Sequence, residues 1–219
     1  MSIGGLLLLA CAGQEPAFPT GGSGDWGGSS GGDDTPEDTG SEPEAPCWPV
    51  QTGWPDCSSS AKGVEGEGWA VGEVQPEWFA TDQYGQTWSS RRFHGLVVVV
   101  DIGAGWCGPC NWSAPGAQAL YAEHKDEGLI VVQLMLADWN SQPTSVDFLQ
   151  EWQTEHELTL PVVMDESEGG LPAPYAAWYE LGYVEGLPTY AIIDREGRLK
   201  TIWTGVDEFR LEEEVLAAL

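Results

Sequence analysis

Two cysteines, Cys107 and Cys110, are separated in this chain only by a glycine and a proline. The pair follows the apolar run LVVVVDI at residues 96–102 and opens a stretch of helical composition. A cysteine at a helix N-terminus faces unpaired backbone N–H groups and the positive end of the helix dipole, which both stabilise a thiolate. Two intervening residues in the first turn bring the second sulfur within disulfide distance. The pattern therefore predicts a redox-active dithiol.

Other functions of a C-x-x-C pair fit this sequence less well. A structural zinc site needs two more ligands at metal spacing, and the chain has no second C-x-x-C and no H-x3–5-H pattern. Haem attachment needs a histidine after the second cysteine, where Asn111 stands. A structural disulfide is a further alternative, although so short a loop contributes little stability. We expect neither a metal nor an organic cofactor.

A second pair, Cys47 and Cys57, brackets the segment WPVQTGWPD. In an oxidising compartment we expect these two cysteines to form a disulfide, whose loop closure contributes about 3 kcal/mol. We predict that this bond is structural. The alternative is an auxiliary redox pair that passes electrons to Cys107.

The fifth cysteine, Cys11, follows the apolar run MSIGGLLLLA. The tetrapeptide LLAC at residues 8–11 resembles the lipobox of bacterial lipoproteins, in which the cysteine is acylated. The basic flank of a signal peptide is missing, and the alternative is an apolar tail with a free thiol. Residues 12–46 are rich in Gly, Ser, Pro and acids. Such a segment cannot bury enough apolar surface to offset its ordering entropy, so we predict a disordered linker.

The 219-residue chain carries 35 acidic and 8 basic residues, a formal charge of −27. Because nucleic acids and anionic membrane surfaces attract basic proteins, this balance argues against both as partners. No stretch approaches the roughly 18 apolar residues that span a bilayer. The histidines show no shared spacing, and we expect His124 and His156 to be solvated at helix ends. Twelve tryptophans could form a carbohydrate-binding surface, but we favour packing.

Strand-like and helix-like segments alternate from about residue 62 onwards. Continuous β-branched runs predict buried strands, and a Gly-containing turn predicts one further antiparallel strand. The strands are expected at residues 96–102, 129–136, 188–193 and 199–204, and the helices at 109–126, 145–156, 174–181 and 208–219. This alternation predicts an α/β fold with a central mixed sheet and helices on both faces.

The segment WCGPC at residues 106–110, placed after a buried strand, resembles the thioredoxin superfamily. Asp101 lies where thioredoxins carry a buried acid, and Pro115 where they carry a helix-kinking proline. The loop GLPT at residues 186–189 is similar to the one in which the family's cis-proline faces the dithiol. The resemblance covers roughly residues 70–219 and implies a thioredoxin-like fold.

Two additions resemble the membrane-tethered TlpA/ResA-like branch, with its redoxin-type proteins. One is an N-terminal β-hairpin at residues 78–88, and the other is an insertion at residues 137–174 that contains a helix and the strand-like segment PVVM. The predicted regions are a signal peptide with lipobox (1–11), a linker (12–46), a cysteine-bracketed covering segment (47–69) and a thioredoxin-like domain (70–219). This organisation implies a lipid-anchored protein on the periplasmic or extracytoplasmic face of the bacterial cell envelope.

The resemblance also implies catalytic roles. Cys107 would attack a protein disulfide, and Cys110 would resolve the mixed disulfide that forms. Asp101, buried near Cys110, would have a raised pKa and take the proton of the resolving thiol. The alternative for Asp101 is a helix-facing or solvated carboxylate.

Three further residues are expected to contact the substrate. A cis-proline at Pro188 would shape the groove, and Leu187 would supply backbone hydrogen bonds to an extended peptide. Trp106 would shield the disulfide, with simple packing as the alternative.

These features predict a thiol:disulfide oxidoreductase that acts on protein thiols and disulfides. The Gly-Pro pair between the cysteines resembles that of reducing thioredoxins, which favours a reductant recharged by a membrane electron donor. One alternative is a thiol peroxidase of the same fold, which usually carries threonine where Ala104 stands. The other is a non-catalytic module that holds a peptide in the groove beside Pro188.

Overall fold

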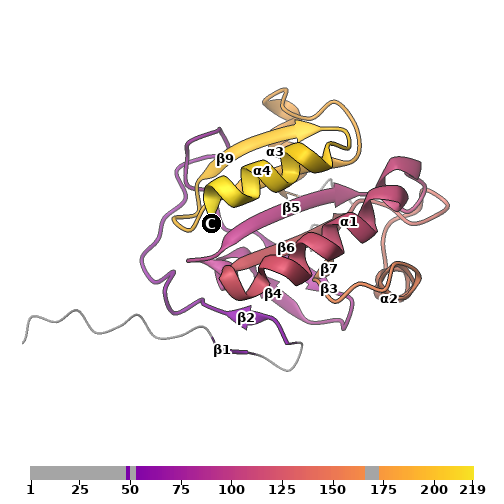
Figure 1. Cartoon of the computed structure of the whole chain (residues 1–219), viewed down its shortest axis with the longest axis horizontal. Coiled ribbons are helices and arrows are strands. Elements are labelled where there is room, and N and C mark those ends of the chain that lie inside the picture. Colours follow the sequence, from indigo (N-terminus) through magenta and orange to yellow (C-terminus); the bar gives the residue numbers. More distant parts are fainter. Residues whose placement is uncertain (1–47, 50–52, 166–172) are drawn as a thin grey trace, which may run out of the picture. The chain divides into compact units, whose positions relative to one another are not determined.

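The valine-rich run forms the central strand β5 (Val97–Gly103), which lies between β6 (Leu129–Met135) and β8 (Thr189–Ile193) (Figure 1). This computed structural model describes residues 48–49, 53–165 and 173–219. β5 pairs in parallel with β6 and antiparallel with β8. Because both faces of β5 are covered, its sequence is a continuous apolar run rather than an alternation of apolar and polar residues.

Four more strands complete a seven-stranded sheet in the order β4-β3-β7-β6-β5-β8-β9. β7 (Val162–Asp165) is parallel to β6, and β9 (Leu199–Thr204) is antiparallel to β8. The hairpin of β3 (Phe79–Asp82) and β4 (Thr87–Ser89) joins the sheet through β7. The predicted mixed sheet and the N-terminal hairpin are therefore confirmed, and the inserted strand connects the two.

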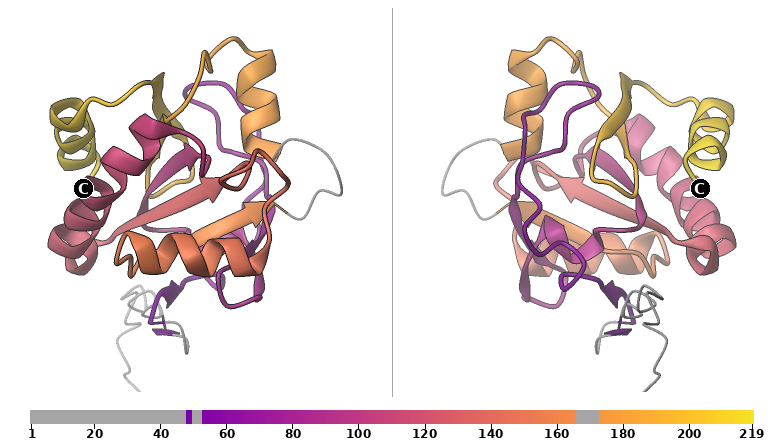
Figure 2. Two further views of the ribbon diagram at one scale, coloured as in Figure 1. Left: turned by 90° about the vertical axis from the view of Figure 1, so that its right-hand side faces the viewer. Right: turned by 90° about the vertical axis from the view of Figure 1, so that its left-hand side faces the viewer.

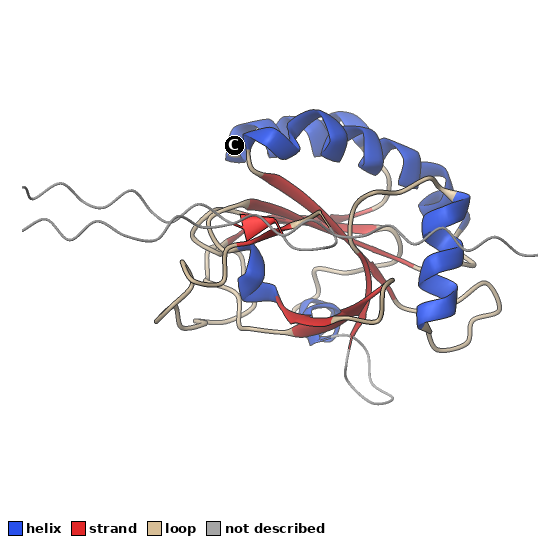
Figure 3. Ribbon diagram, turned by 90° about the horizontal axis from the view of Figure 1, so that it is seen from below, coloured by secondary structure: helices blue, strands red, loops and turns tan. Residues whose placement is uncertain are grey.

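Helices cover both faces of this sheet, as predicted (Figure 2). α1 (Gly108–His124) and α4 (Glu208–Ala218) lie side by side on one face, where Figure 3 shows them along the twisted sheet. α3 (Ala173–Glu180) lies on the opposite face. α2 (Val146–Glu155) packs against β7 and β3. Each helix begins and ends within two residues of its predicted bounds.

The part of the N-terminal segment around Trp69 lies beside α3 (Figure 2), and the 3-10 helix η1 (Ser90–Phe93) follows β4. Trp54 is 1% exposed, and its indole Nε1 donates to the carbonyl oxygen of Thr159 at 2.8 Å. The ring of Trp69 packs edge-to-face on Trp178. The predicted packing role of the tryptophans therefore holds for Trp54 and Trp69.

Several predictions concern the N-terminal region. Cys57 is buried and disulfide-bonded. Its predicted partner Cys47, the lipidation site Cys11 and the linker at residues 12–46 lie outside the described residues. A small antiparallel pair that the sequence did not predict joins β1 (Trp48–Pro49) to β2 (Pro55–Asp56). Within the described ranges no helix has the length and apolar character needed to cross a membrane.

The buried side chain of Gln83 joins the hairpin to the inserted strand. Its Nε2 donates to the carbonyl oxygen of Leu160 at 3.0 Å, and its Oε1 accepts from the Val162 N–H at 2.9 Å. Gln83 is fully buried, at 0% exposure. The side chain therefore satisfies two buried main-chain groups that lie far from it in sequence.

We expect Gln83→Ala to lower the free energy of unfolding by about 3 kcal/mol, because it leaves a buried donor and a buried acceptor unpaired. Urea unfolding monitored by circular dichroism measures this loss. Gln86→Ala is the matched control, because Gln86 lies exposed in the same turn. Equal stability of the two variants would contradict this account of the junction.

Candidate active site

Cys107 and Cys110 form a disulfide at the start of α1, with their Cα atoms 5.2 Å apart. Cys107 is the N-cap residue of the helix, and its Sγ accepts a hydrogen bond from the Cys110 N–H at 3.2 Å. The two residues are 4% and 3% exposed. The first sulfur thus already contacts a helix N-terminal donor of the kind that stabilises a thiolate.

The loop before the disulfide is held by Asn111 and by two glycines. The Asn111 amide donates to the carbonyl oxygens of Gly105 and Cys107, both at 2.9 Å. A Cβ at Gly105 would lie 2.7 Å from backbone atoms of residues 138 and 139, so no other residue fits without a backbone shift. A Cβ at Gly103 would lie 3.5 Å from the Cys110 sulfur. The end of β5 therefore lies directly against the second cysteine.

Asp101 lies on the face of β5 that carries α1. Side chains two residues apart on a strand point to the same side, and Gly103 faces Cys110. Asp101 is 3% exposed, and burial raises the pKa of its carboxyl to about 6, while a hydrogen bond from Gln133 opposes the rise. A solvated carboxylate is therefore wrong, whereas the other part of that alternative, a carboxylate that faces a helix, agrees with the position of Asp101 on the α1 side.

Asp101 has polar neighbours on both adjacent strands. The Gln133 Nε2 on β6 donates to the Asp101 Oδ2 at 2.9 Å, and the Gln133 Oε1 accepts from the Trp152 Nε1 at 2.8 Å. On β8, Tyr190 is the cross-strand partner of Asp101. Burial, and then the negative charge of Asp101, raise the pKa of Tyr190 far above its usual value, while a hydrogen bond with Ser113 opposes the rise.

The Leu187–Pro188 peptide bond is cis, as the resemblance implied. Thr189 pairs with Ile102 near the C-terminal end of β5. The cis bond therefore lies at the same end of the central strands as the disulfide. Pro188 is buried and Leu187 is partly exposed. The Pro188 carbonyl oxygen accepts from the Gly205 N–H at 2.8 Å, which joins this loop to the end of β9.

Three exposed tryptophans lie near the disulfide. Trp106 and Trp112 flank the two cysteines in the sequence, and Trp139 lies against the loop that precedes them. Trp106 is 54% exposed, which argues against a simple packing role for its ring. Trp112 is 67% exposed on α1. Trp139 is 36% exposed, and its backbone nitrogen lies against Gly105. Trp112 and Trp139 were not singled out from the sequence, because their exposure depends on the tertiary packing around them.

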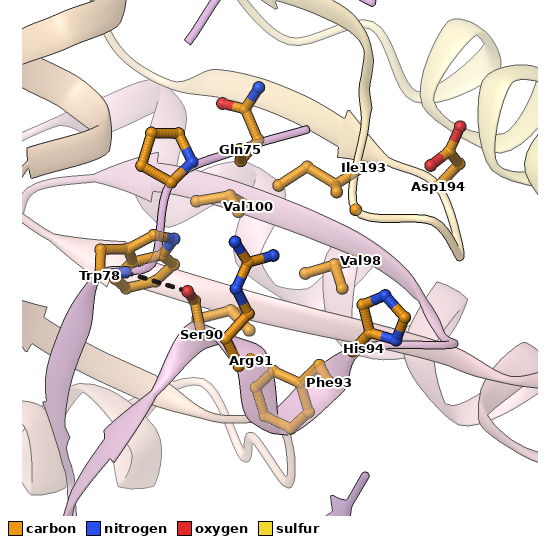
Figure 4. Close-up of a pocket in the computed structure, with 13 residues that line it drawn as sticks. Gln75, Trp78, Ser90, Arg91, Phe93, His94, Val98, Val100, Ile193 and Asp194 are labelled. Atoms are coloured by element: carbon orange, nitrogen blue, oxygen red, sulfur yellow. Dashed lines mark hydrogen bonds between the residues drawn. The ribbon is translucent and has the colours of Figure 1, made fainter. Parts of the chain in front are cut away.

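An apolar pocket lies on the opposite face of the sheet (Figure 4). Its floor includes Val98 and Val100, which alternate along β5 with the residues that face α1. Arg91 and His94 also line it, together with Trp78. None of its lining residues belongs to the disulfide, to Asp101 or to the cis-proline loop. The pocket and the dithiol are therefore separate features.

The histidines form no metal site in the part of the chain that the structure describes, where no three His, Cys, Asp or Glu side chains cluster. The expectation of a solvated ring is wrong for His124, whereas His156 is partly exposed. His124 is 7% exposed, with its Nδ1 3.4 Å from the Glu127 Oε2. The ring of His156 lies 4.3 Å from that of Trp152, and its burial lowers the pKa of the imidazole.

Comparisons with known proteins agree with this geometry. A family model described as the AhpC/TSA family matches residues 71–202. The chain belongs to the AhpC/TSA family. Thiol-disulfide oxidoreductase ResA from Geobacillus kaustophilus is 30% identical over 136 residues, which are 62% of this chain and 70% of that protein. ResA from Geobacillus thermodenitrificans is 28% identical, also over 136 residues that make up 62% of this chain and 70% of that protein.

Solved structures show the same fold. A Chlorobium tepidum protein assigned as the thiol:disulfide interchange protein DsbE is 25% identical, with a TM-score of 0.55 over 68% of this chain and 97% of that one. A thioredoxin domain of a Bacteroides vulgatus thiol-disulfide oxidoreductase has a TM-score of 0.54 at 20% identity, over 68% of this chain and 96% of that one. This AhpC/TSA family member is thus a thioredoxin-like thiol-disulfide oxidoreductase with a Cys107–Cys110 pair.

Burial of Asp101 gives this family member a pH-dependent stability. The pKa of the carboxyl is raised from 3.8 to about 6 in the folded chain. The folded state therefore binds this proton more tightly than the unfolded state does. The stabilisation is fully present below about pH 3.8 and is lost as the pH rises through about 6.

We expect Asp101→Asn to be more stable than the wild type by about 3 kcal/mol at pH 8 and nearly equal to it at pH 4, because the variant buries no charge. Urea unfolding of the oxidised proteins at both pH values measures the difference. Glu123→Gln, which removes an exposed carboxylate from α1, controls for net charge. A pH-independent difference would contradict the burial argument.

Proposed function

We propose that the chain reduces disulfides of extracytoplasmic proteins through the Cys107–Cys110 dithiol. The observation that carries the proposal is the position of this pair at the start of α1, with a buried carboxyl on the strand beneath it. The ResA-type relatives supply the reaction class. The residues of this chain supply a mechanism in two steps.

In the first step the Cys107 thiolate attacks one sulfur of a substrate disulfide. A mixed disulfide forms between Cys107 and the substrate, and the second substrate sulfur leaves as a thiolate. The N–H of Cys110, which lies 3.2 Å from the Cys107 sulfur, stabilises the attacking charge. Cys107 is only 4% exposed, and we propose that the substrate reaches it between Trp106 and the cis-proline loop.

In the second step Cys110 resolves the mixed disulfide. The Asp101 carboxylate accepts the Cys110 thiol proton, and the resulting thiolate attacks the Cys107 sulfur. The Cys107–Cys110 bond forms, and the remaining substrate sulfur leaves as a thiolate. Gly103, which faces Cys110, lies two residues after Asp101, a separation of roughly 7 Å along the strand. We propose that the Asp101 carboxylate reaches Cys110 directly or through one water. A raised pKa suits a base that must hold a proton briefly at neutral pH.

The cis-proline loop is proposed to hold the substrate backbone. Leu187 is partly exposed, and the hydrogen bonds among the described residues leave its N–H and C=O unpaired. An extended peptide could pair with both groups beside Pro188. Trp106 would then cover the bound disulfide from the other side.

We also propose an envelope location with a lipid anchor at Cys11. The LLAC tetrapeptide and the acidic linker support an anchor followed by a spacer. The disulfide state of Cys57 supports an oxidising compartment. We assign its partner as Cys47 and the bond as structural. A membrane electron donor would then return two electrons to the Cys107–Cys110 disulfide after each turnover.

Replacing each cysteine in turn tests the order of attack. We expect Cys110→Ser to accumulate a mixed disulfide with a disulfide-containing polypeptide, because the resolving thiol is absent. Non-reducing electrophoresis with mass spectrometry identifies the linked residue. Cys107→Ser is the matched control and should trap nothing and retain no reductase activity. Trapping through Cys110 in that control would reverse the assigned roles.

The reduction potential tests the direction of electron flow. We expect a value of about −270 mV, as in reducing thioredoxins, rather than about −120 mV, as in strong oxidants. Equilibration of the full chain with glutathione or dithiothreitol buffers, followed by thiol alkylation, measures it. Cys47→Ser combined with Cys57→Ser removes any contribution from the second pair. A potential at the oxidising end would make the chain a disulfide-forming enzyme.

A further inference from the structure

A buried glutamine joins the proposed proton acceptor to the inserted helix. Gln133 lies on β6 directly beside Asp101 and is 3% exposed. One end of its amide contacts the Asp101 carboxylate at 2.9 Å, and the other contacts the Trp152 indole at 2.8 Å. Trp152 is itself fully buried, at 0% exposure. A side chain with a donor end and an acceptor end thus connects β5 to α2.

The indole fixes which way this amide points. The Trp152 Nε1 can only donate, so it must face the amide oxygen of Gln133. The amide NH2 group is then turned towards Asp101 and donates to its Oδ2. Rotating the amide by half a turn would set two donors against each other at Trp152 and two acceptors against each other at Asp101. The Trp152 indole, which can only donate, and the Asp101 carboxylate thus favour the same orientation of the Gln133 amide.

The environment of Asp101 gives this single hydrogen bond its importance. The groups that face it are Tyr190 on β8, the dithiol on α1 and, beyond Tyr190, Glu208 on α4. His156, the C-cap residue of α2, contacts the ring of Trp152 and not Asp101. Among the described residues no cation contributes to the ionisation of Asp101, and Gln133 is the group that opposes the effect of burial.

We propose that Gln133, oriented by Trp152, is a positioning residue that holds Asp101 in the ionised form needed to accept the proton of Cys110. The inference rests on the proposed function, because it assumes that Asp101 is the proton acceptor. Gln133 contacts neither the substrate nor the sulfurs. It acts by donating a hydrogen bond that stabilises the carboxylate more than the carboxylic acid.

Removing the donor should make Asp101 harder to ionise. We expect Gln133→Met, which keeps the length of the side chain, to raise the pKa of Asp101 by about one pH unit. Infrared titration of the carboxyl C=O stretch in the oxidised protein measures this without turnover, with Asp101→Asn identifying the band. The pH profile of mixed-disulfide resolution should move to higher pH by the same amount.

Removing the indole donor tests the orienting role of Trp152. We expect Trp152→Phe to raise the pKa of Asp101 by less than Gln133→Met, because the freed amide still donates part of the time. Trp152→Phe combined with Gln133→Met should match Gln133→Met alone, since Trp152 acts only through Gln133. Additive shifts in the double variant would overturn the orienting role.

Gln83→Met is the matched control for destabilisation. Gln83 is a buried glutamine that also bridges two partners, but it contacts main-chain groups at the hairpin junction. We expect it to lose stability without moving the pKa of Asp101. An unchanged pKa in Gln133→Met, or an equal shift in Gln83→Met, would overturn the inference.

Two readouts separate this inference from the proposed function. A carboxyl pKa that rises in Gln133→Met while the pH profile of resolution stays fixed would show that Asp101 is not the proton acceptor. The role proposed for Asp101, and with it the positioning role of Gln133, would then be overturned. Suppose instead that Asp101→Asn slows resolution, but Gln133→Met changes neither the pKa of Asp101 nor the pH profile of resolution. The proposed function then stands, and only the positioning role of Gln133 is overturned.

Discussion

Burial of one carboxyl in the central strand is the constraint on which the site depends. A charged group removed from water is costly unless hydrogen bonds replace the lost hydration. Asp101 receives such a bond from Gln133, which in turn needs the Trp152 indole to satisfy its oxygen. α2 must therefore deliver Trp152 to the sheet, and this requirement ties the inserted segment to the chemistry at the start of α1.

The second requirement of the site is that the backbone before the disulfide approaches its neighbours closely. The strand ends at Gly103, where Cys110 occupies the space of a side chain, and Gly105 passes against the loop at residues 138 and 139. The Asn111 side chain, in the first turn of α1, donates hydrogen bonds to the carbonyl oxygens of Gly105 and Cys107 and so fixes this loop against the helix. Glycines before the disulfide and the Asn111 amide after it thus both help to position the two cysteines.

Sequence patterns predicted what depends on local chemistry. The β-branched runs gave the strands, and the cysteine spacing gave the disulfide at a helix start. Gln133 was not predicted, although it is the one polar residue in the run LIVVQLML. Its role depends on Trp152, which lies on another element of the fold. The burial of His124, and the place of β7 between β3 and β6, likewise depend on tertiary packing.

Side chains alternate along β5, so the buried carboxyl and the apolar pocket lie on opposite faces of the sheet. Asp101 and Gly103 face α1, whereas Val98 and Val100 line the apolar pocket beneath the N-terminal segment. A shift of one residue in pairing would place the carboxyl in that apolar layer and remove it from the disulfide. Pairing with β6 on one side and β8 on the other fixes the register along most of the strand. The long hydrogen-bonded ladders of the central strand are thus what keep the carboxyl beneath the sulfur it is proposed to serve.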